Sequence, residues 1–332
     1  MRSVIIAGAG VIGLSCAWRL AQRGWHVTVF DSGEAAHESS WAAAGMLAPG
    51  GDIDSNASLA KMAVRSLRMF PEFVRGLEEE SGDTLEFRQC GAVEVAMDET
   101  EAEALTQRAA RQAAVGIVST PCRYRDLAAR AFPADCIVDP LSINDLLLTV
   151  CRLRGVVIRE REAVTGVIAD GRGIRTATAE YHSDRVLIAA GAWSSTLLPG
   201  LPSVHPVRGH LLSFEMEPGL LNTIVRNGPT YMFQRESGAL IAGSSIEATG
   251  FDRTVDTAVA ADIHKRAAKL LPALAAATPS NCWNGLSPAT DVGPVLGRVG
   301  ETSVWTAYGH FRNGILLAPD TALTISDEFG SA

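Results

Sequence analysis

Ser3-Val4-Ile5-Ile6-Ala7-Gly8-Ala9-Gly10-Val11-Ile12-Gly13 is the stretch of this chain that decides its fold. A short apolar run leads directly into three glycines, which predicts a buried strand, a glycine-rich turn and a helix over about 11–23. In such a turn Gly8 permits the tight bend and Gly10 lets a phosphate approach the backbone. Gly13 lets the helix pack closely on the strand.

The residues after this turn complete a dinucleotide site. The first amides of the expected helix, at Val11 and Ile12, lie at the positive end of its dipole and suit a pyrophosphate. Gly24 ends the helix, residues 26–30 read as a second strand, and Asp31 at its tip can bind ribose hydroxyls. This order of strand, glycines, helix, strand and acid predicts a Rossmann-type nucleotide-binding unit.

The bulk composition is that of an ordinary globular protein. Hydrophobic residues make up 47% of the 332 residues and charged residues 20%, and the length favours two domains over one. The net charge of −8 disfavours nucleic acid as a partner, and no apolar run is long enough to be a membrane span. Because the apolar N-terminal run carries the glycine turn and lacks signal-peptide features, we expect a cytoplasmic protein.

The six cysteines and seven histidines do not form a recognisable metal site. The cysteines include no C-x-x-C motif, and no two histidines have the spacing of metal ligands. We therefore expect no metal and interpret the cysteines as reduced structural thiols.

The rest of the chain alternates between helical and strand patterns. Apolar residues recur at helical spacing over 59–80, where Pro71 is expected to break or kink the helix. Further helices are expected over 99–114, from an N-cap signal at 142–145 to Leu153, over 255–276 and from Ile315 onward. Buried strands are expected at 156–158, 185–190 and 303–307, and an antiparallel sheet from alternating segments at 210–214, 231–234 and 239–242.

Two longer stretches resemble a known enzyme family. The spacing from Gly13 to Asp31 is typical of FAD proteins rather than nicotinamide proteins. Residues 38–49, ESSWAAAGMLAP, resemble the small-residue loop that runs under the flavin in glycine oxidases and their D-amino-acid-oxidase relatives. Residues 309–319, GHFRNGILLAP, resemble the closing turn and helix of that family. Shorter matches occur in the same order at 137–140, 206–209, 250–252 and 291–297.

The resemblance implies an α/β fold, with a glutathione-reductase-like Rossmann domain that binds FAD and an inserted antiparallel-sheet α+β domain for the substrate. The FAD-binding domain is expected over 1–48, 140–205 and 283–332, and the substrate domain over 49–139 and 206–282. A second nucleotide fingerprint is absent from the sequence, which argues against an NAD(P)H-dependent reductase.

The resemblance also implies which residues hold the cofactor. FAD is expected to bind without a covalent bond, because no cysteine lies in the closing turn. Main chain makes most flavin contacts in this family, so the side chain of His310 is expected only to pack. The expected cofactor-binding residues are Gly8, Gly10, Val11, Ile12, Gly13, Asp31, Ser32, Ser39, Ser40, Ala43, Ala44, Gly45, Met46, Val164, Ala190, Gly191, Trp193, His310, Phe311, Arg312, Asn313, Gly314, Ile315 and Leu316.

The implied reaction is oxidation of a small amine or amino acid, glycine-like or D-configured, to an imine that water hydrolyses, with molecular oxygen as acceptor and hydrogen peroxide as product. Tyr231 in the antiparallel sheet and Arg312 in the closing turn match two members of the family's carboxylate clamp. The third member is an arginine in a Gly-Leu-Arg-Pro turn, but residues 285–288 read GLSP, so Ser287 replaces it. Ile246 matches an apolar wall residue above the flavin.

Ser287 leaves three interpretations open. Arg312, with Arg226 or Arg235 brought round from the sheet, binds the carboxylate; or the substrate lacks a carboxylate there; or the turn has shifted and Ser287 makes no substrate contact. We give Arg208 no catalytic role and expect it to pair with a carboxylate at the surface.

The alternatives to an amino-acid oxidase are a flavin amine dehydrogenase, an oxidase of a substituted, carboxylate-free amine in a specialised biosynthetic pathway, and a non-catalytic FAD-binding protein. The expected partners are a small-molecule amine and oxygen, without nucleic acid or membrane. A homo-oligomer is left open by the sequence.

Overall fold

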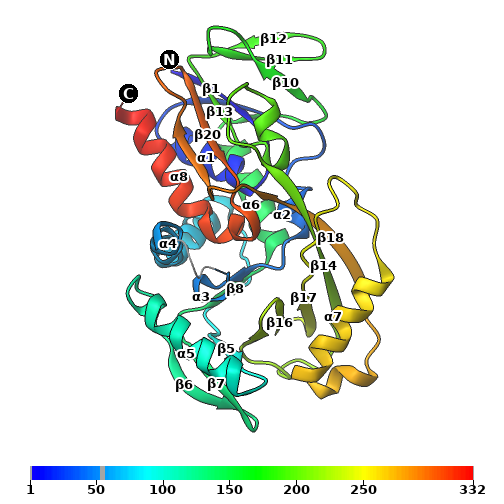
Figure 1. Ribbon diagram of the computed structural model, residues 1–332. Coiled ribbons are helices and arrows are strands. Elements are labelled where there is room, and N and C mark those ends of the chain that lie inside the picture. The colour runs from blue at the N-terminus through cyan, green and yellow to red at the C-terminus, as the bar shows by residue number, and fades with distance from the viewer. Residues whose placement is uncertain (1, 53–56, 332) are drawn as a thin grey trace.

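The first strand lies in the middle of a six-stranded sheet (Figure 1). The computed structural model describes residues 2–52 and 57–331. Across the sheet the strands are β19 (Val295–Arg298), β20 (Val304–Tyr308), β13 (Arg185–Ile188), β1 (Ser3–Ala7), β2 (His26–Phe30) and β9 (Val157–Arg159). All neighbours are parallel except the edge pair β19 and β20. The expected nucleotide unit is therefore assembled from the start, middle and end of the chain.

Four helices pack together beside this sheet. They are α1 (Val11–Gln22), α4 (Ala57–Ser81), α6 (Pro140–Leu153) and α8 (Gly314–Ser331). The break expected at Pro71 does not occur, because α4 continues through it and buries Phe70, Phe73 and Leu77 on one face. The apolar face outweighs the one backbone hydrogen bond that a proline removes.

The start of α6 differs slightly from the expectation. Asp139, not a residue of 142–145, is its N-cap, and its carboxylate accepts a hydrogen bond of 2.9 Å from the Ser142 amide. Pro140 occupies the first turn, where a missing amide proton costs nothing.

An eight-stranded, mostly antiparallel sheet forms the second layer, below the first in Figure 1. Its order is β18 (Asn281–Ala289), β14 (His205–Glu215), β17 (Ala239–Gly243), β16 (Thr230–Gln234), β15 (Ile224–Asn227), β5 (Ala92–Val95), β7 (Leu127–Phe132) and β6 (Thr120–Tyr124). Helix α7 (Thr257–Leu270) covers strands β14, β16 and β17. Strand β18 crosses the domain boundary expected between residues 282 and 283, and the division into two domains stays a prediction.

The remaining elements are short or peripheral. The expected helix over 255–276 ends at Leu270 and continues as the 3-10 turn η2 (Pro272–Ala276). The others are α2 (Ser39–Ala42), β3 (Met46–Leu47), α3 (Pro49–Asp52), β4 (Phe87–Arg88), α5 (Glu99–Ala113), β8 (Cys136–Val138), β10 (Val164–Val167), β11 (Gly173–Thr176), β12 (Glu180–His182), η1 (Gly191–Thr196) and η3 (Phe311–Asn313). Within the described residues, no helix combines the length and the apolar character that crossing a bilayer requires.

A buried ion cluster holds β15 to its neighbours. The Arg226 guanidinium is 3% exposed and donates to Glu94 at 3.0 Å and to Asp135 at 2.6 Å. Its Cζ also lies 4.4 Å from the centroid of the Phe132 ring. Both carboxylates are buried; Glu94 also pairs with Arg108, whereas Arg226 is the cation that compensates Asp135.

Replacing Arg226 by Met is therefore expected to lower the free energy of unfolding by about 3–5 kcal/mol, because it leaves the buried Asp135 carboxylate uncompensated. Urea unfolding followed by circular dichroism measures the change. Arg75→Met on the surface of α4 is the matched control, since Arg75 makes only exposed ion pairs and should change stability by less than about 0.5 kcal/mol. Equal effects of the two substitutions would contradict the structural role of the cluster.

Candidate functional site

A cavity of about 500 Å³ lies where the two large sheets meet. One wall is built from the carboxyl ends of β1, β13 and β20, which is where ligands bind in open α/β sheets. The opposite wall comes from strands β14, β16 and β18 of the antiparallel sheet. Both walls are continued by the loop over 38–48 and by the turn that precedes α8.

The structure brings nearly all of the expected site residues to this cavity. Of the expected cofactor residues, all but Gly13 and Leu316 line it, and so do Tyr231, Ser287, Ile246 and Arg312. Gly13 has a packing role instead, and Leu316 is 1% exposed in the core.

Two glycines allow the closest contacts in the nucleotide unit. A Cβ on Gly13 would lie 1.9 Å from the carbonyl oxygen of Gly8. Gly8 itself has φ +109°, and a Cβ there would lie 2.3 Å from the carbonyl oxygen of Ala189 on the way out of β13. Any side chain at either position would push α1 or β13 away from the turn.

Asp31 is fixed by backbone amides rather than by a cation. One carboxylate oxygen accepts from the Ala9 amide at 2.8 Å and the other from the Gly33 amide at 2.9 Å. Burial raises the pKa of Asp31 above its usual value, and the two amide hydrogen bonds oppose that rise. The carboxylate is thereby oriented at the end of β2 with lone pairs left for ribose hydroxyls.

The small-residue loop is fastened on both sides of the cavity. The Ser40 hydroxyl accepts a 2.9 Å hydrogen bond from the amide of Val11, the first residue of α1. On the other side, the Ser39 hydroxyl donates to the carbonyl oxygen of Leu286, and Trp283 Nε1 donates to the carbonyl oxygen of Ala42 at 3.1 Å. The loop thus joins the nucleotide unit to β18.

The turn before α8 holds a buried neutral histidine. His310 is 3% exposed, and its Nε2 lies 3.0 Å from the Thr321 hydroxyl. Burial lowers the pKa of His310 from 6.5 to about 3, so the imidazole is uncharged at neutral pH. This packing role agrees with the sequence expectation.

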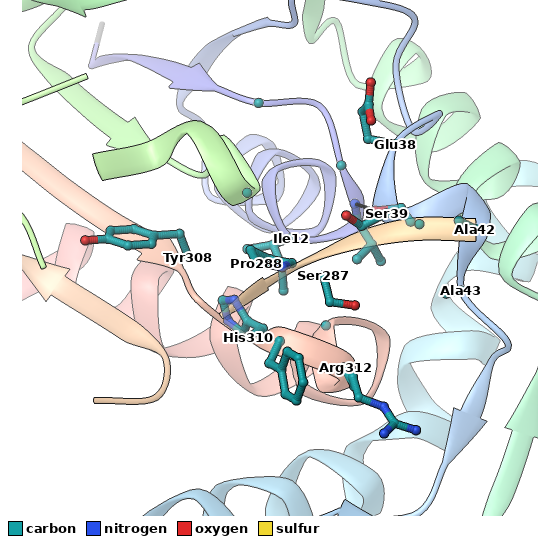
Figure 2. A pocket seen from close by; sticks show the side chains of 18 of the residues that line it. Ile12, Glu38, Ser39, Ala42, Ala43, Ser287, Pro288, Tyr308, His310 and Arg312 are labelled. Carbon is teal, nitrogen blue, oxygen red and sulfur yellow. Dashed lines mark hydrogen bonds between the residues drawn. The ribbon is translucent and has the colours of Figure 1, made fainter. Parts of the chain in front are cut away.

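The substrate-side residues lie on neighbouring elements. The Arg312 Cζ is 5.9 Å from the centroid of the Tyr231 ring. Figure 2 shows Ser287 and Arg312 in the same part of the pocket, while the side chain of Tyr308 points away from them. Ile246 is 56% exposed, so it is no core residue and can form an apolar wall.

The expectation of a turn at 285–288 was wrong. These residues lie within β18 and pair in register with β14, where Ser287 faces Val207 across the ladder. Pro288 is compatible with this pairing because β18 is an edge strand. Ser287 still lines the cavity, so its position is compatible with a substrate contact, which stays a prediction.

The arginines considered as partners of Arg312 are committed elsewhere. Arg226 belongs to the ion cluster described above, and Arg235 donates to the Ala44 carbonyl at 2.7 Å. Neither lines the cavity. Arg208 does line it, but it is 4% exposed and its guanidinium bonds Glu247 at 2.8 Å and Asp252 at 2.7 Å. Since the Asp252 side chain is 48% exposed, the expected pairing of Arg208 with a surface carboxylate is confirmed, but the Arg208 side chain itself is buried.

Sequence reasoning missed several residues that line the cavity. Tyr308 is the last residue of β20, and the rule that sites form at carboxyl ends of parallel strands could have found it. Ser244 and Ser245, which follow β17, carry no comparable signal, because their position depends on the register of the antiparallel sheet. In the described part of the chain no group of histidines, cysteines and carboxylates could hold a metal ion.

Comparison with known proteins places this geometry in one family. The family model described as FAD dependent oxidoreductase matches residues 3–328. Glycine oxidase of Pseudomonas putida is 31% identical, with 98% of this chain and 94% of that protein covered, and glycine oxidase of Pseudomonas aeruginosa is 30% identical, with 98% and 93% covered. The crystal structure of glycine oxidase from Geobacillus kaustophilus superposes with a TM-score of 0.93 at 27% identity, over 100% of this chain and 95% of that chain.

Replacing Gly10 by Leu is expected to abolish FAD binding. A Cβ there would already lie 3.1 Å from the Ser40 hydroxyl oxygen, and the remaining side chain would fill space at the N-terminus of α1 that a pyrophosphate needs. The flavin-to-protein ratio of the purified protein measures the effect. Gly33→Ala should retain FAD, because its Cβ would be at an ordinary 3.9 Å from Asp31. A fully loaded Gly10→Leu protein would refute this position for the pyrophosphate.

His310 is expected to make stability fall in acid. Because folding holds its pKa near 3 instead of 6.5, the unfolded chain binds the extra proton between these values. The stability difference between wild type and His310→Gln should therefore shrink below pH 6.5, by at most roughly 1.4 kcal/mol per pH unit. Urea unfolding of both proteins across this range, with FAD in excess, measures it. Parallel pH profiles would show that His310 does not titrate in this way.

Proposed function

The chain belongs to the FAD-dependent oxidoreductase family of the glycine and D-amino-acid oxidases, and from that premise we propose that it oxidises a small amino acid of the glycine class through Tyr231 and Arg312. Oxidative deamination of an amine or amino acid is the chemistry of this family. The observation that carries the finer proposal is the cavity itself, which joins the nucleotide turn to an arginine and a tyrosine in one space.

The residues of the cavity fit FAD. Gly10 leaves the backbone open at the start of α1, and Asp31 stands at the end of β2 with both oxygens oriented. We propose a non-covalent cofactor, since among the described residues none of the cysteines lines the cavity. Bound FAD would supply the two-electron acceptor for the amine.

The protein's own contribution is binding and orientation. The Arg312 guanidinium offers a charge-assisted contact to a substrate carboxylate, and the Tyr231 ring, 7% exposed, limits the room beside it. Ile246 presents an apolar surface that helps to exclude water from the bound amine. The neutral His310 adds no charge that would compete for the carboxylate.

Ser287 favours a second candidate substrate. A hydroxyl cannot form the bidentate pair that arginine forms with a carboxylate, and Arg226 and Arg235 do not line the cavity to replace it. An amine without a carboxylate at this place, such as a substituted amine of a biosynthetic pathway, would not need that pair. We therefore propose, as a second candidate function, the oxidation of an amine that has no carboxylate.

Product analysis tests the proposed reaction. The holo-protein is incubated in air with glycine, D-alanine and simple carboxylate-free amines, and peroxide and released ammonia are measured. Equal amounts of both products from glycine or D-alanine support the amino-acid oxidase. A parallel incubation contains an artificial electron acceptor such as a quinone. Ammonia that forms only with this acceptor, and without peroxide, identifies a dehydrogenase and overturns oxygen as the acceptor. No ammonia from any of these amines overturns the proposal.

Replacing Ser287 by Arg should change substrate preference. The new guanidinium can pair with a carboxylate, whereas without one it would be an uncompensated charge in a partly buried site. We expect the ratio of kcat/KM for glycine to kcat/KM for a carboxylate-free amine to rise by about tenfold or more, equivalent to about 1.4 kcal/mol. Ser280→Arg, at a position away from the cavity, is the control. Efficient glycine turnover by wild type, with no gain in Ser287→Arg, would refute a role of Ser287 in substrate choice.

A further inference from the structure

Arginine and tryptophan side chains stack at the end of the six-stranded sheet where its parallel strands begin, opposite the cavity. The Arg2 Cζ lies 4.8 Å from the centroid of the Trp25 ring. The Arg185 Cζ lies 4.9 Å from Trp25 and 4.8 Å from Trp305. The Arg298 Cζ lies 5.4 Å from Trp305. We call this alternating set of three guanidinium groups and two indole rings the arginine ladder.

The topology of the sheet assembles the ladder. Arg2 and Trp25 precede β1 and β2, and Arg185 is the first residue of β13. These parallel strands all begin at the same end of the sheet, and their carboxyl ends line the FAD cavity. Since five strand residues span roughly 15 Å, the ladder is well separated from that cavity. In Figure 1 the chain begins and α8 ends at this end of the sheet.

A second cavity, of about 260 Å³, opens beside the ladder. Besides the ladder it is lined by Arg172, Asp184 and Ser303. The carbonyl oxygen of Arg172 accepts a 3.0 Å hydrogen bond from the Ser183 amide, and a Cβ on Gly171 would lie 3.2 Å from a methyl group of Val304. The turn that carries Arg172 is thus packed against the start of β20, which fixes the backbone of Arg172, the fourth arginine at this cavity.

Arginines outnumber carboxylates in the lining of this second cavity. A further carboxylate, that of Glu328, lies beside the ladder and accepts a 3.0 Å hydrogen bond from Trp305 Nε1. Four arginines line the cavity against one carboxylate, Asp184, which accepts both the amide and the hydroxyl hydrogen of Ser3. Within residues 2–52 and 57–331, no ion pair joins Arg2 or Arg172 to a carboxylate. The carboxylate that Arg298 approaches is that of Glu301, at 3.6 Å, which is 98% exposed and thus a weak partner. Arg298 also donates to the carbonyl oxygens of Thr302 at 2.7 Å and Glu301 at 3.2 Å, and Arg185 donates to that of Phe329 at 2.8 Å. The whole chain has a net charge of −8, so this local excess runs against its overall charge.

The chemistry of the site selects a type of ligand. Guanidinium groups present forked donors that match the oxygens of phosphate groups, and stacking on indole rings restricts their orientation in advance. A singly charged anion would neutralise one of four arginines, whereas a phosphate or diphosphate group could bridge several. The burial of Arg185 and the proximity of Arg2 and Arg298 lower the pKa of Arg185, which an anion in this cavity would oppose.

We propose that the arginine ladder and Arg172 form a binding site for a small multivalent oxyanion of the phosphate class, separate from the FAD site. The anion binds either as free inorganic phosphate or diphosphate, or as the phosphate group of a small metabolite.

Calorimetric titration of the holoenzyme with diphosphate, phosphate and glycerol phosphate at constant ionic strength in chloride tests the proposal. Bound FAD keeps its own pyrophosphate site filled, and flavin absorption reports any anion that enters near Arg312. Tryptophan emission reports binding at the ladder, which contains Trp25 and Trp305. Tighter binding of diphosphate than of glycerol phosphate would indicate a free anion as the source, and the reverse order a phosphorylated metabolite.

Two variants and one control locate the bound anion. Arg172→Gln leaves the ladder intact and should weaken binding by about tenfold or more, and Arg2→Gln with Arg298→Gln should remove it. Arg75→Gln, an exposed arginine on α4, should bind like wild type. The proposal is overturned if wild type binds none of the anions, if Arg172→Gln and the double variant bind like wild type, or if binding changes flavin absorption but not tryptophan emission.

Discussion

The contact between the glycine turn, α1 and β13 is the constraint on which the rest of this structure depends. A side chain on Gly8 would be 2.3 Å from one backbone oxygen, and one on Gly13 would be 1.9 Å from another. These distances exclude any side chain unless the backbone moves. Because β1 is central in its sheet, a shift here would displace the helix N-terminus and Asp31, which is held by the Ala9 amide.

A second set of contacts joins this nucleotide unit to the antiparallel sheet. The small-residue loop caps α1 through Ser40 and bonds the backbone of β18 through Ser39. A Cβ on Gly285 of β18 would lie 2.6 Å from the Cβ of Ala42, so small residues on both sides permit this approach. The residue that sets substrate choice in our proposal, Ser287, is therefore positioned by the same loop that lines the cofactor cavity.

Local patterns in the sequence were sufficient to predict the helices and strands that short-range periodicity and capping residues determine. The glycine turn, the central strands and most helices were predicted, because apolar periodicity and caps are visible within ten to twenty residues. Register between distant strands is not visible in this way, so residues 285–288 were interpreted as a turn although they pair with β14. The partners of Arg208 and Arg226 were missed for the same reason, since Glu247 and Glu94 reach them only through the sheet.

The central claim is that this cavity holds FAD beside a small amine. It is tested most directly by mixing the yellow holo-protein with amines in the absence of oxygen and recording the flavin spectrum. The account predicts that glycine, D-alanine or a carboxylate-free amine bleaches the oxidised flavin, and does so at least as fast as the enzyme turns over that amine in air. A flavin that light reduces but that none of these amines bleaches would contradict it.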